Sequence, residues 1–454
     1  MRTRPFKTVL CLILATSALT GCEIPSEESQ AANREPDSIS LAISRPEAQV
    51  SAGFRTATAQ AAATDPSTRA AEGAILRGGY SVDEARGALQ PQISGSLYAG
   101  MADGLDGDPG ASARLSLSQV VYDGGEIQAD IRENQLDQRI AYESYRDTLN
   151  TNLREAGDAW IALWLTQRVQ TQTEERLGMI RPLFSQVERV AQMGIADRAV
   201  VTAARRQVND ILQSELDAKE AKRQAEANFR RYFGTLPGSA SYNASFLNRY
   251  VPSRIDERSL LTSPEVVGGF LTYQRAIARR DLSEARDRAS IDLEARIDEP
   301  LDNDTTGDSQ VGLVLSKTLY DGGIRRARIN QSATAVVEAR DNLQNTYRNN
   351  GRRAATLLES IRANRPSLEL AREDLKVNQE EVSVLGRQLA IGQSALDDVL
   401  EAQVRLYQAE VSILRQEAEL GRLQLQLLAL LGRLPDAFGI REENVLDRLE
   451  SAGR

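Results

Sequence analysis

The stretch SLSQVVYDGGEIQ, residues 116–128, reads as a β-strand that stops at Tyr-Asp-Gly-Gly and continues as charged, helix-forming sequence. The same four residues return in VLSKTLYDGGIRR, residues 314–326, at an offset of 198 residues. Because glycine adopts positive φ at little steric cost, each Gly-Gly pair can turn the chain from strand to helix. The sequence therefore predicts two strand-to-helix turns, at Asp123, Gly124 and Gly125 and at Asp321, Gly322 and Gly323.

The repetition at an offset of 198 residues extends far beyond this motif. Sliding the sequence against itself by that distance pairs Pro66 with Pro264 and Leu117 with Leu315 without a gap, which indicates an internal duplication. The predicted organisation is a signal peptide 1–21, an N-terminal extension 22–62, a first repeat 63–237, a linker 238–262, a second repeat 263–435 and a C-terminal tail 436–454.

The composition limits the class of protein. Only 5% of the 454 residues are aromatic and 26% are charged, which is typical of long helices. The absence of histidine excludes a Ser-His-Asp triad and a histidine-ligated metal, and no spacing of carboxylates marks an acid-base pair. A formal net charge of -9 argues against nucleic acid as a partner. We therefore expect that the protein is not an enzyme and that it has no catalytic residue, no metal site and no cofactor.

The first 22 residues have the order of a secretory signal. Three basic residues precede the apolar run TVLCLILATSAL, which is too short to span a membrane and leads into LTGC, residues 19–22. This ending resembles the lipobox of bacterial lipoproteins, which implies cleavage before Cys22, a lipid attached to it and contact with outer-membrane lipid. Glu23 is not the aspartate that retains such proteins at the inner membrane in some bacteria. An ordinary signal peptide with an incidental cysteine is the alternative.

Each repeat contains two segments in which apolar and polar residues alternate. Alternation with a period of two predicts strands at about 90–102, 111–122, 289–299 and 309–320. In the third segment, Ile291, Leu293, Ala295 and Ile297 alternate with charged residues, so one face is apolar and the other is charged. A water-facing sheet on a soluble core would give the same pattern. The secretion signal and strands of about ten residues favour an outer-membrane barrel.

Long helical stretches follow both glycine turns. Residues 126–191 carry apolar residues in steps of three and four, and 66 helical residues would reach about 100 Å. Two shorter stretches, 66–88 and 196–233, are together about as long and can run alongside it end to end. Gly194 and Gly392 would then lie at hairpin tips, where a left-handed residue ends a long helix. Simple breaks in a bent helix are the alternative reading of these glycines.

Four strands per chain cannot close a barrel, so chains would have to pool their strands. The duplication, LQPQISGS at 89–96, the two Tyr-Asp-Gly-Gly segments and GQSALDDVLEAQVRLYQAE at 392–410 resemble the TolC-like outer-membrane efflux proteins. The resemblance implies an α+β membrane protein: a homotrimer whose twelve strands form one β-barrel, continued by an antiparallel coiled-coil tunnel of α-helices through the periplasm.

The resemblance also implies a function and partners. The protein would be an outer-membrane exit duct, recruited by a periplasmic adaptor (membrane fusion) protein and an inner-membrane ABC or RND-type transporter. Tyr-Asp-Gly-Gly is more typical of members in type I protein secretion, whereas a lipid anchor is frequent in small-molecule efflux. The alternative is a periplasmic coiled-coil adaptor or a structural envelope lipoprotein, which would lack two symmetric pairs of alternating strands.

By the same resemblance, Asp398 and Glu401 match acids that form rings at the periplasmic constriction and select cations. They lie three apart in LDDVLEA, so both can face one side of a helix. Other gate residues of the family are missing, because Leu389, Ser394 and Val200 stand where a tyrosine, an arginine and an acid are typical. Ordinary solvated acids near a turn are the alternative reading.

Overall fold

The computed structural model describes residues 49–101, 109–194, 198–301 and 307–440, all of which belong to one compact unit spanning residues 47–454. The predicted signal peptide and Cys22 lie outside the described residues. The elements are η2 (Val50–Ala52), α3 (Gly53–Thr64), α4 (Pro66–Gly87), β1 (Gln92–Met101), β2 (Pro109–Tyr122), α5 (Glu126–Gln192), α6 (Arg198–Phe233), η3 (Ser245–Arg249), α7 (Glu257–Leu260), α8 (Pro264–Ala285), β3 (Ser290–Pro300), β4 (Asp308–Ser316), α9 (Ile324–Ala390), α10 (Leu396–Leu430) and α11 (Leu434–Phe438).

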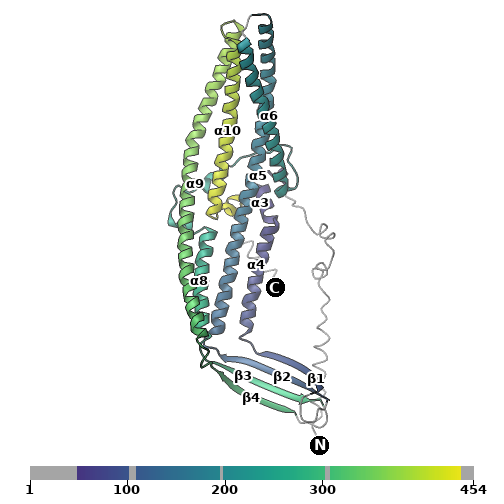
Figure 1. The fold of residues 1–454 in the computed structure, drawn as a ribbon, viewed down its shortest axis with the longest axis vertical. Coiled ribbons are helices and arrows are strands. Elements are labelled where there is room, and N and C mark those ends of the chain that lie inside the picture. The colour runs from purple at the N-terminus through teal and green to yellow at the C-terminus, as the bar shows by residue number, and fades with distance from the viewer. Residues whose placement is uncertain (1–48, 102–108, 195–197, 302–306, 441–454) are drawn as a thin grey trace. The chain divides into compact units, whose positions relative to one another are not determined.

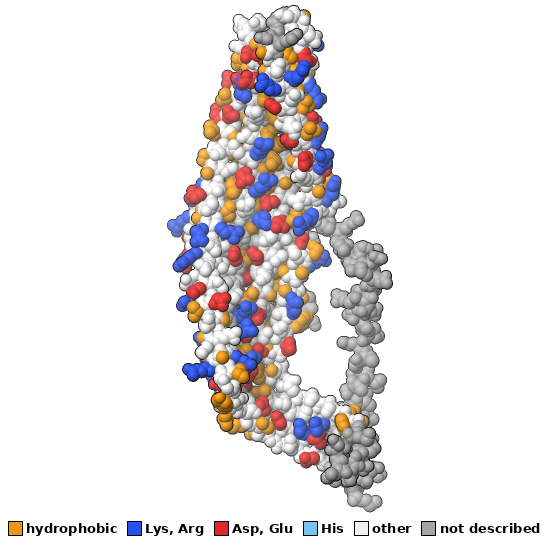
Figure 2. Space-filling model, viewed as in Figure 1, with side chains coloured by type: hydrophobic (Ala, Val, Ile, Leu, Met, Phe, Trp, Pro, Cys, Tyr) orange, Lys and Arg blue, Asp and Glu red, His pale blue; other side chains and the backbone are white. Residues whose placement is uncertain are grey.

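Two long helices organise the helical part. α5 and α9 each contain 67 residues, so each is about 100 Å long. α4 and α6 pack one after the other along α5, whereas α8 and α10 lie between α5 and α9 (Figure 1). Acidic and basic side chains are interspersed over the helices on the face drawn in Figure 2. The shorter helices are therefore the paired partners that the sequence predicts for the long ones.

α4 and α8 begin opposite buried asparagines in the middle of the long helices. Pro66 and Pro264 start α4 and α8, where a proline fits because the first backbone N–H of a helix needs no helical acceptor. In the first repeat, Asn152 Nδ2 donates to Ser67 Oγ and to Thr68 Oγ1, both at 2.8 Å. In the second, Asn350 Nδ2 donates to Ser263 Oγ at 3.2 Å. The two asparagines lie 198 residues apart, and each donates to a hydroxyl near the start of a shorter helix.

The four strands form one antiparallel sheet in the order β1-β2-β3-β4. The two hairpins have the same register, because Ile93 is opposite Leu117 in the first and Ile291 is opposite Leu315 in the second. The sequence predicted a fourth strand over 309–320, but β4 ends at Ser316, so the predicted end is wrong. β2 continues to Tyr122 because β3 pairs with its last residues, whereas β4 has no strand on its outer side among the described residues.

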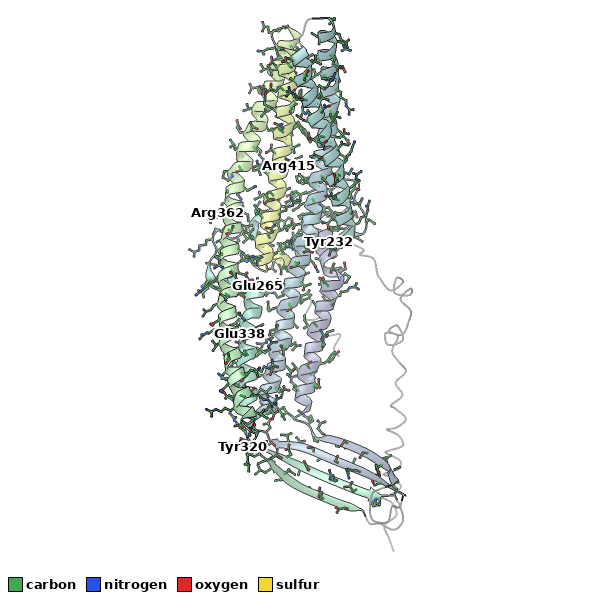
Figure 3. The ribbon with its side chains drawn as sticks, in the orientation of Figure 1. Tyr232, Glu265, Tyr320, Glu338, Arg362 and Arg415 are labelled. Atoms are coloured by element: carbon green, nitrogen blue, oxygen red, sulfur yellow. The ribbon has the colours of Figure 1, made fainter. Side chains whose placement is uncertain are left out.

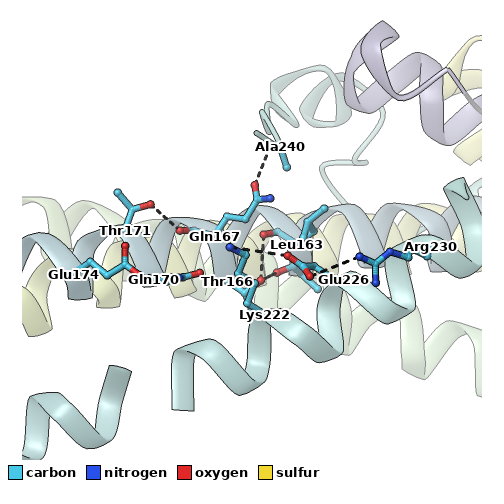
Figure 4. Close-up of polar contacts among 11 residues, drawn as sticks. Leu163, Thr166, Gln167, Gln170, Thr171, Glu174, Lys222, Glu226, Arg230 and Ala240 are labelled. Atoms are coloured by element: carbon cyan, nitrogen blue, oxygen red, sulfur yellow. Dashed lines mark hydrogen bonds and ion pairs between the residues drawn. The ribbon is translucent and has the colours of Figure 1, made fainter. Parts of the chain in front are cut away.

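A central core lies around the middle of α5 and joins segments far apart in the sequence. Phe54 of α3 contacts Trp160, Tyr242, Phe246 and Phe438, with ring centroids 5.3 to 6.0 Å apart. Side chains of α5 form hydrogen bonds with backbone groups of the segment after α6. Trp160 Nε1 donates to the Ser241 carbonyl at 2.9 Å. The Ala240 N–H donates to Gln167 Oε1 at 2.9 Å, as Figure 4 shows. Parts of the predicted extension, linker and tail therefore fold onto the helices.

Candidate functional site: sheet faces, turns and hairpin tips

Most of the large apolar residues of the four strands lie on one face of the sheet. The register places Ile93, Leu117, Ala295 and Val311 in one row across all four strands, and it pairs Leu115 with Ile297 and Leu293 with Leu313. Large side chains on this face are exposed in the single chain, with 69% of Leu315 and 76% of Val311 accessible. The face includes Ile93, Leu97, Ala99, Ala113, Leu115, Leu117, Ile291, Leu293, Ala295, Ile297, Val311, Leu313 and Leu315.

The opposite face of the sheet is polar. Arg114 Nε lies 2.5 Å from Asp298 Oδ1 across the β2–β3 pair, and the hydroxyls of Ser94 and Ser116 are 2.7 Å apart across the β1–β2 pair. The face also carries Ser96, Ser118, Asp292, Glu294, Arg296 and Gln310. Such a sheet, apolar on one side and charged on the other, suits a boundary between hydrocarbon and water. Its outer edges, β1 and β4, are unpaired among the described residues.

The two Tyr-Asp-Gly-Gly segments form near-identical turns where the sheet meets the helices. Gly124 and Gly125 have φ of 66° and 92°, and Gly322 and Gly323 have 68° and 93°, a region that favours glycine. In each turn the aspartate caps the following helix. Asp123 accepts from Gly125 N at 2.8 Å and from Ile127 N at 2.6 Å. These N–H groups would otherwise lack acceptors, so the motif stabilises the start of α5.

The second turn has the same chemistry at Asp321, which accepts from Arg325 N at 2.9 Å and Gly323 N at 3.0 Å. The N–H of Arg325, followed by that of Gly323 and by the Arg325 guanidinium, lowers the pKa of Asp321. The surroundings of the two turns differ. A Cβ on Gly124 would lie 2.6 Å from Arg288 Cβ, whereas Gly322 has open space around it in the single chain.

Gly194 and Gly392 each lie two residues beyond the last residue of a long helix. Both have φ of 76°, and their N–H groups donate to the carbonyls of Ala191 and Leu389, respectively. Residues 195–197 lie outside the described part of the first hairpin, as does the side chain of Val200. A groove of about 750 Å³ lies between the ends of the two hairpins, lined by Gln186, Arg189, Val190, Gln192, Met193, Leu389 and Leu396.

Asp398 and Glu401 lie in the first turns of α10, and both are exposed in the single chain. Asp398 Oδ2 accepts from the backbone N–H of Ala395 at 3.2 Å, which helps to cap the helix. Arg405 Nη1 donates to Glu401 Oε1 at 2.8 Å, and its Nη2 donates to Glu381 Oε1 of α9 at 2.7 Å. Each acid therefore has a local contact within its own hairpin.

A buried polar contact between the two hairpins was missed by sequence reasoning. Arg176 of α5 is only 5% exposed and lies 2.7 Å from Glu410 Oε2 of α10, and it also donates to Gln403. One turn away, the hydroxyls of Thr173 and Tyr407 are 2.8 Å apart. The only sequence signal is a charge within a heptad pattern, which solvated helix faces also show. This Arg176 contact joins the first hairpin to the second within one chain.

The described residues lack the features of two other classes of site. No described helix is both long and apolar enough to cross a membrane. No group of three or more potential metal ligands was found in the described ranges. The described part of the molecule is distinguished by its one-sided sheet, its paired turns and its long helical hairpins, a combination that suits a subunit of an outer-membrane channel.

Comparison with known proteins identifies the family within that class. A family model described as outer membrane efflux protein matches residues 57–235 and 260–433, so the chain belongs to the outer membrane efflux protein family. The chain is 22% identical over 397 residues to the outer membrane protein TolC of Escherichia coli, covering 81% of this chain and 79% of that protein. It is 21% identical over 369 residues to the outer membrane efflux protein BepC of Brucella suis, covering 79% and 80%.

The fold comparison agrees with this result. The chain superposes on the CmeC outer membrane channel of Campylobacter jejuni with a TM-score of 0.71, covering 91% of this chain and 92% of that one at 14% identity. At that identity the likeness concerns the fold: long helical hairpins continuing from a four-stranded sheet. The expected family is confirmed.

Proposed function

We propose that the protein is the outer-membrane exit duct of a tripartite export system and that it works as a passive channel rather than an enzyme. The observation that carries the proposal is the four-stranded sheet with one apolar face, one charged face and two edges that are unpaired among the described residues, continuous with helices about 100 Å long. Membership of the outer membrane efflux protein family supports the same function.

The active form is a homotrimer. An open sheet edge cannot face lipid, because its backbone N–H and C=O groups would lack partners there. Three copies of four strands make a barrel of twelve, with the apolar face toward lipid and the charged face toward a water-filled lumen. The helices of the three copies then enclose a tunnel, and a periplasmic adaptor joins that tunnel to an inner-membrane ABC or RND-type transporter. The cargo is a secreted protein or a small molecule.

The mature protein is held in the outer membrane by a lipid on Cys22 as well as by its barrel. The order of basic residues, apolar run and Leu-Thr-Gly-Cys supports this proposal. The weaker alternative is a lipid-anchored periplasmic adaptor or a structural lipoprotein, because neither role requires a sheet in which every strand carries apolar residues on the same face.

The periplasmic end of the tunnel carries an acidic ring from Asp398 and Glu401. Three copies of each would place six carboxylates around a narrow opening, which favours cations. The purified protein should form a cation-selective pore in planar lipid bilayers, and multivalent cations should block it from the helical side. A membrane-inserted trimer that carries no current would contradict the duct itself.

The ring is tested separately by removing charge while keeping the helix cap. Asp398→Asn/Glu401→Gln retains oxygen acceptors, so α10 should keep its start while selectivity and block are largely lost. Asp397→Asn removes a carboxylate from the adjacent position and is the matched control. If the double variant keeps the parent's selectivity and block, the constriction lies elsewhere, and the duct assignment is unaffected.

A further inference from the structure

A recess lies between the two long helices where two shorter helices meet. α10 ends at Leu430 and α8 begins at Pro264, and both helices pack between α5 and α9. The two helix ends are held together, because Thr262 Oγ1 donates to the Leu431 carbonyl at 2.8 Å and a Cβ on Gly432 would lie 2.7 Å from Pro264 Cδ. Beside this junction, the space between the helix ends is a recess of about 890 Å³.

The recess lies on the face of α5 that is turned away from the central core. Asp147 and Arg154 line the recess, whereas Leu149, Leu153 and Trp160 are buried in the core. With about 3.6 residues per turn, the two sets project from nearly opposite sides of the helix.

α9 shows the same division between its two faces. Arg352 and Thr356 line the recess, whereas Ala354 and Leu358 pack with Leu260 of α7 on the other side. The core-side face of the long helices therefore carries an added layer of chain. In the proposed duct, the opposite face, which contains the recess, lines the tunnel.

Three charged side chains of the recess have partners of opposite charge. Arg154 lies 2.9 Å from Glu155 and 3.4 Å from Asp158, both on its own helix. Arg353 of α9 lies 3.9 Å from Glu265, which is at the start of α8 in the middle of the molecule (Figure 3). These pairs balance part of the charge in the recess.

Arg352 and Asp147 also line the recess, and neither has an ion-pair partner in the part of the chain that the structure describes. Arg352 donates to the neutral side chain of Asn349. Partial burial of the Asp147 carboxyl, followed by the nearby Glu265, raises its pKa, whereas Arg353 lowers it. A cation beside Asp147 would favour the charged carboxylate. One guanidinium and one carboxylate are thus available to a ligand.

The internal duplication does not account for this combination. At the offset of 198 residues, Arg352 corresponds to Arg154 and Asp147 corresponds to Asn345. Arg154 is paired with acids of its own helix, and Asn345 is neutral. The two unpaired opposite charges therefore belong to the junction between α8 and α10.

We propose that this recess binds zwitterionic small molecules on their way through the duct, with Arg352 holding the anionic group and Asp147 the cationic group. The site rests on the proposed function, because it requires the recess to face the tunnel. A guanidinium offers two parallel N–H donors to a carboxylate. Leu357 and Leu430 also line the recess and can contact the apolar part of such a molecule.

Trialanine tests the site, because blocking its ends removes one charge at a time. The free peptide carries both charges, the N-acetyl form keeps only the carboxylate, and the C-terminal amide keeps only the ammonium. Binding to the full-length protein in detergent is measured by titration calorimetry or by ligand-detected NMR. Each lost charge should weaken binding about tenfold, as expected for the loss of one charge-assisted hydrogen bond.

Two substitutions should separate the two charges. Arg352→Gln should weaken binding of the free peptide and of the N-acetyl form about tenfold and leave the amide unchanged. Asp147→Asn should weaken binding of the free peptide and of the amide and leave the N-acetyl form at least as tightly bound. Arg348→Gln is the matched control, because it removes an exposed arginine one turn away on α9 that does not line the recess.

The outcomes separate the site from the duct. In planar bilayers, the free peptide should interrupt the current of the parent and of Arg348→Gln, and much less that of Arg352→Gln. Peptide binding that is insensitive to the blocked ends, or that survives both Arg352→Gln and Asp147→Asn, overturns the site and leaves the duct intact. Binding without any effect on the current overturns the position of the recess in the tunnel. A parent protein that carries no current contradicts the duct itself, whatever its peptide binding.

Discussion

Replacing Leu315 by arginine tests which face of the sheet contacts lipid. Leu315 lies on the apolar face of β4, opposite Ile291, and 69% of the side chain is accessible in the single chain. If that face lies in hydrocarbon, an arginine near the bilayer midplane costs about 2 to 4 kcal/mol per copy. Because a trimer carries three copies, the total is about 6 to 12 kcal/mol. Leu315→Arg should therefore greatly reduce the amount of inserted trimer.

The adjacent position supplies a matched control. Val314 belongs to the same strand but points to the charged face, opposite Asp292 of β3. Val314→Arg adds the same side chain next to a carboxylate and beside the proposed lumen, so we expect a change within about 0.5 kcal/mol. Unfolding by denaturant in lipid vesicles gives the free energies, and gel mobility gives the fraction of trimer.

Equal effects at the two positions would refute the assignment of the faces. A soluble sheet resting on a core would be disturbed by either arginine according to local packing alone. A larger loss at Val314 than at Leu315 would reverse the faces and place the charged row toward lipid, which is incompatible with a barrel. Only a large loss confined to Leu315→Arg supports the lipid-facing side proposed above.

Three further predictions concern the anchor and the helices. Mass spectrometry of the mature protein should find a triacylated N-terminal Cys22, and cleavage elsewhere or an unmodified cysteine would contradict the anchor. Arg176→Met should destabilise the fold by about 3 kcal/mol because it leaves Glu410 partly buried without its cation, whereas Arg176→Met/Glu410→Met should be near neutral in the same thermal unfolding assay. Burial raises the pKa of Asp158 from 3.8 to about 6, so the folded protein holds this proton more tightly than the unfolded chain does. The stability that this group contributes at low pH is thus lost as the pH rises from about 4 to 6. Asp158→Asn should therefore raise the unfolding temperature at pH 8 and leave it little changed at pH 4. Equal shifts of the unfolding temperature at both pH values would contradict the titration of Asp158.

The repeats, strands and glycine turns could be predicted because each depends on local sequence. Alternation with a period of two marks a strand that has different surroundings on its two faces, and Asp-Gly-Gly supplies both positive φ and a helix cap. Each signal also occurs twice, with the two copies 198 residues apart. The end of β4 was predicted wrongly for a related reason: residues 317–320 have strand-forming character, but a strand needs a partner, and none lies on that side among the described residues.

The central core could not be predicted, because its residues come from segments with no common period. Phe54, Tyr242, Phe246 and Phe438 lie in parts of the sequence interpreted as an extension, a linker and a tail, yet their rings meet beside Trp160. Contacts between residues so distant in sequence leave no local pattern. The Arg176 contact is similar, because an arginine within a heptad pattern gives no sign that its partner lies 234 residues away.

The acidic positions at the start of α10 illustrate what resemblance adds and what it leaves open. Resemblance selects Asp398 and Glu401 from 64 acidic residues, which no periodicity could do. The contacts then make the two acids unequal. Arg405 donates to both Glu401 and Glu381, so part of the negative charge of Glu401 is balanced within the hairpin. Asp398, in contrast, accepts from a neutral backbone N–H. If both acids border the constriction, Asp398 therefore contributes the larger share of its negative potential, because a neutral donor satisfies a carboxylate without cancelling its charge.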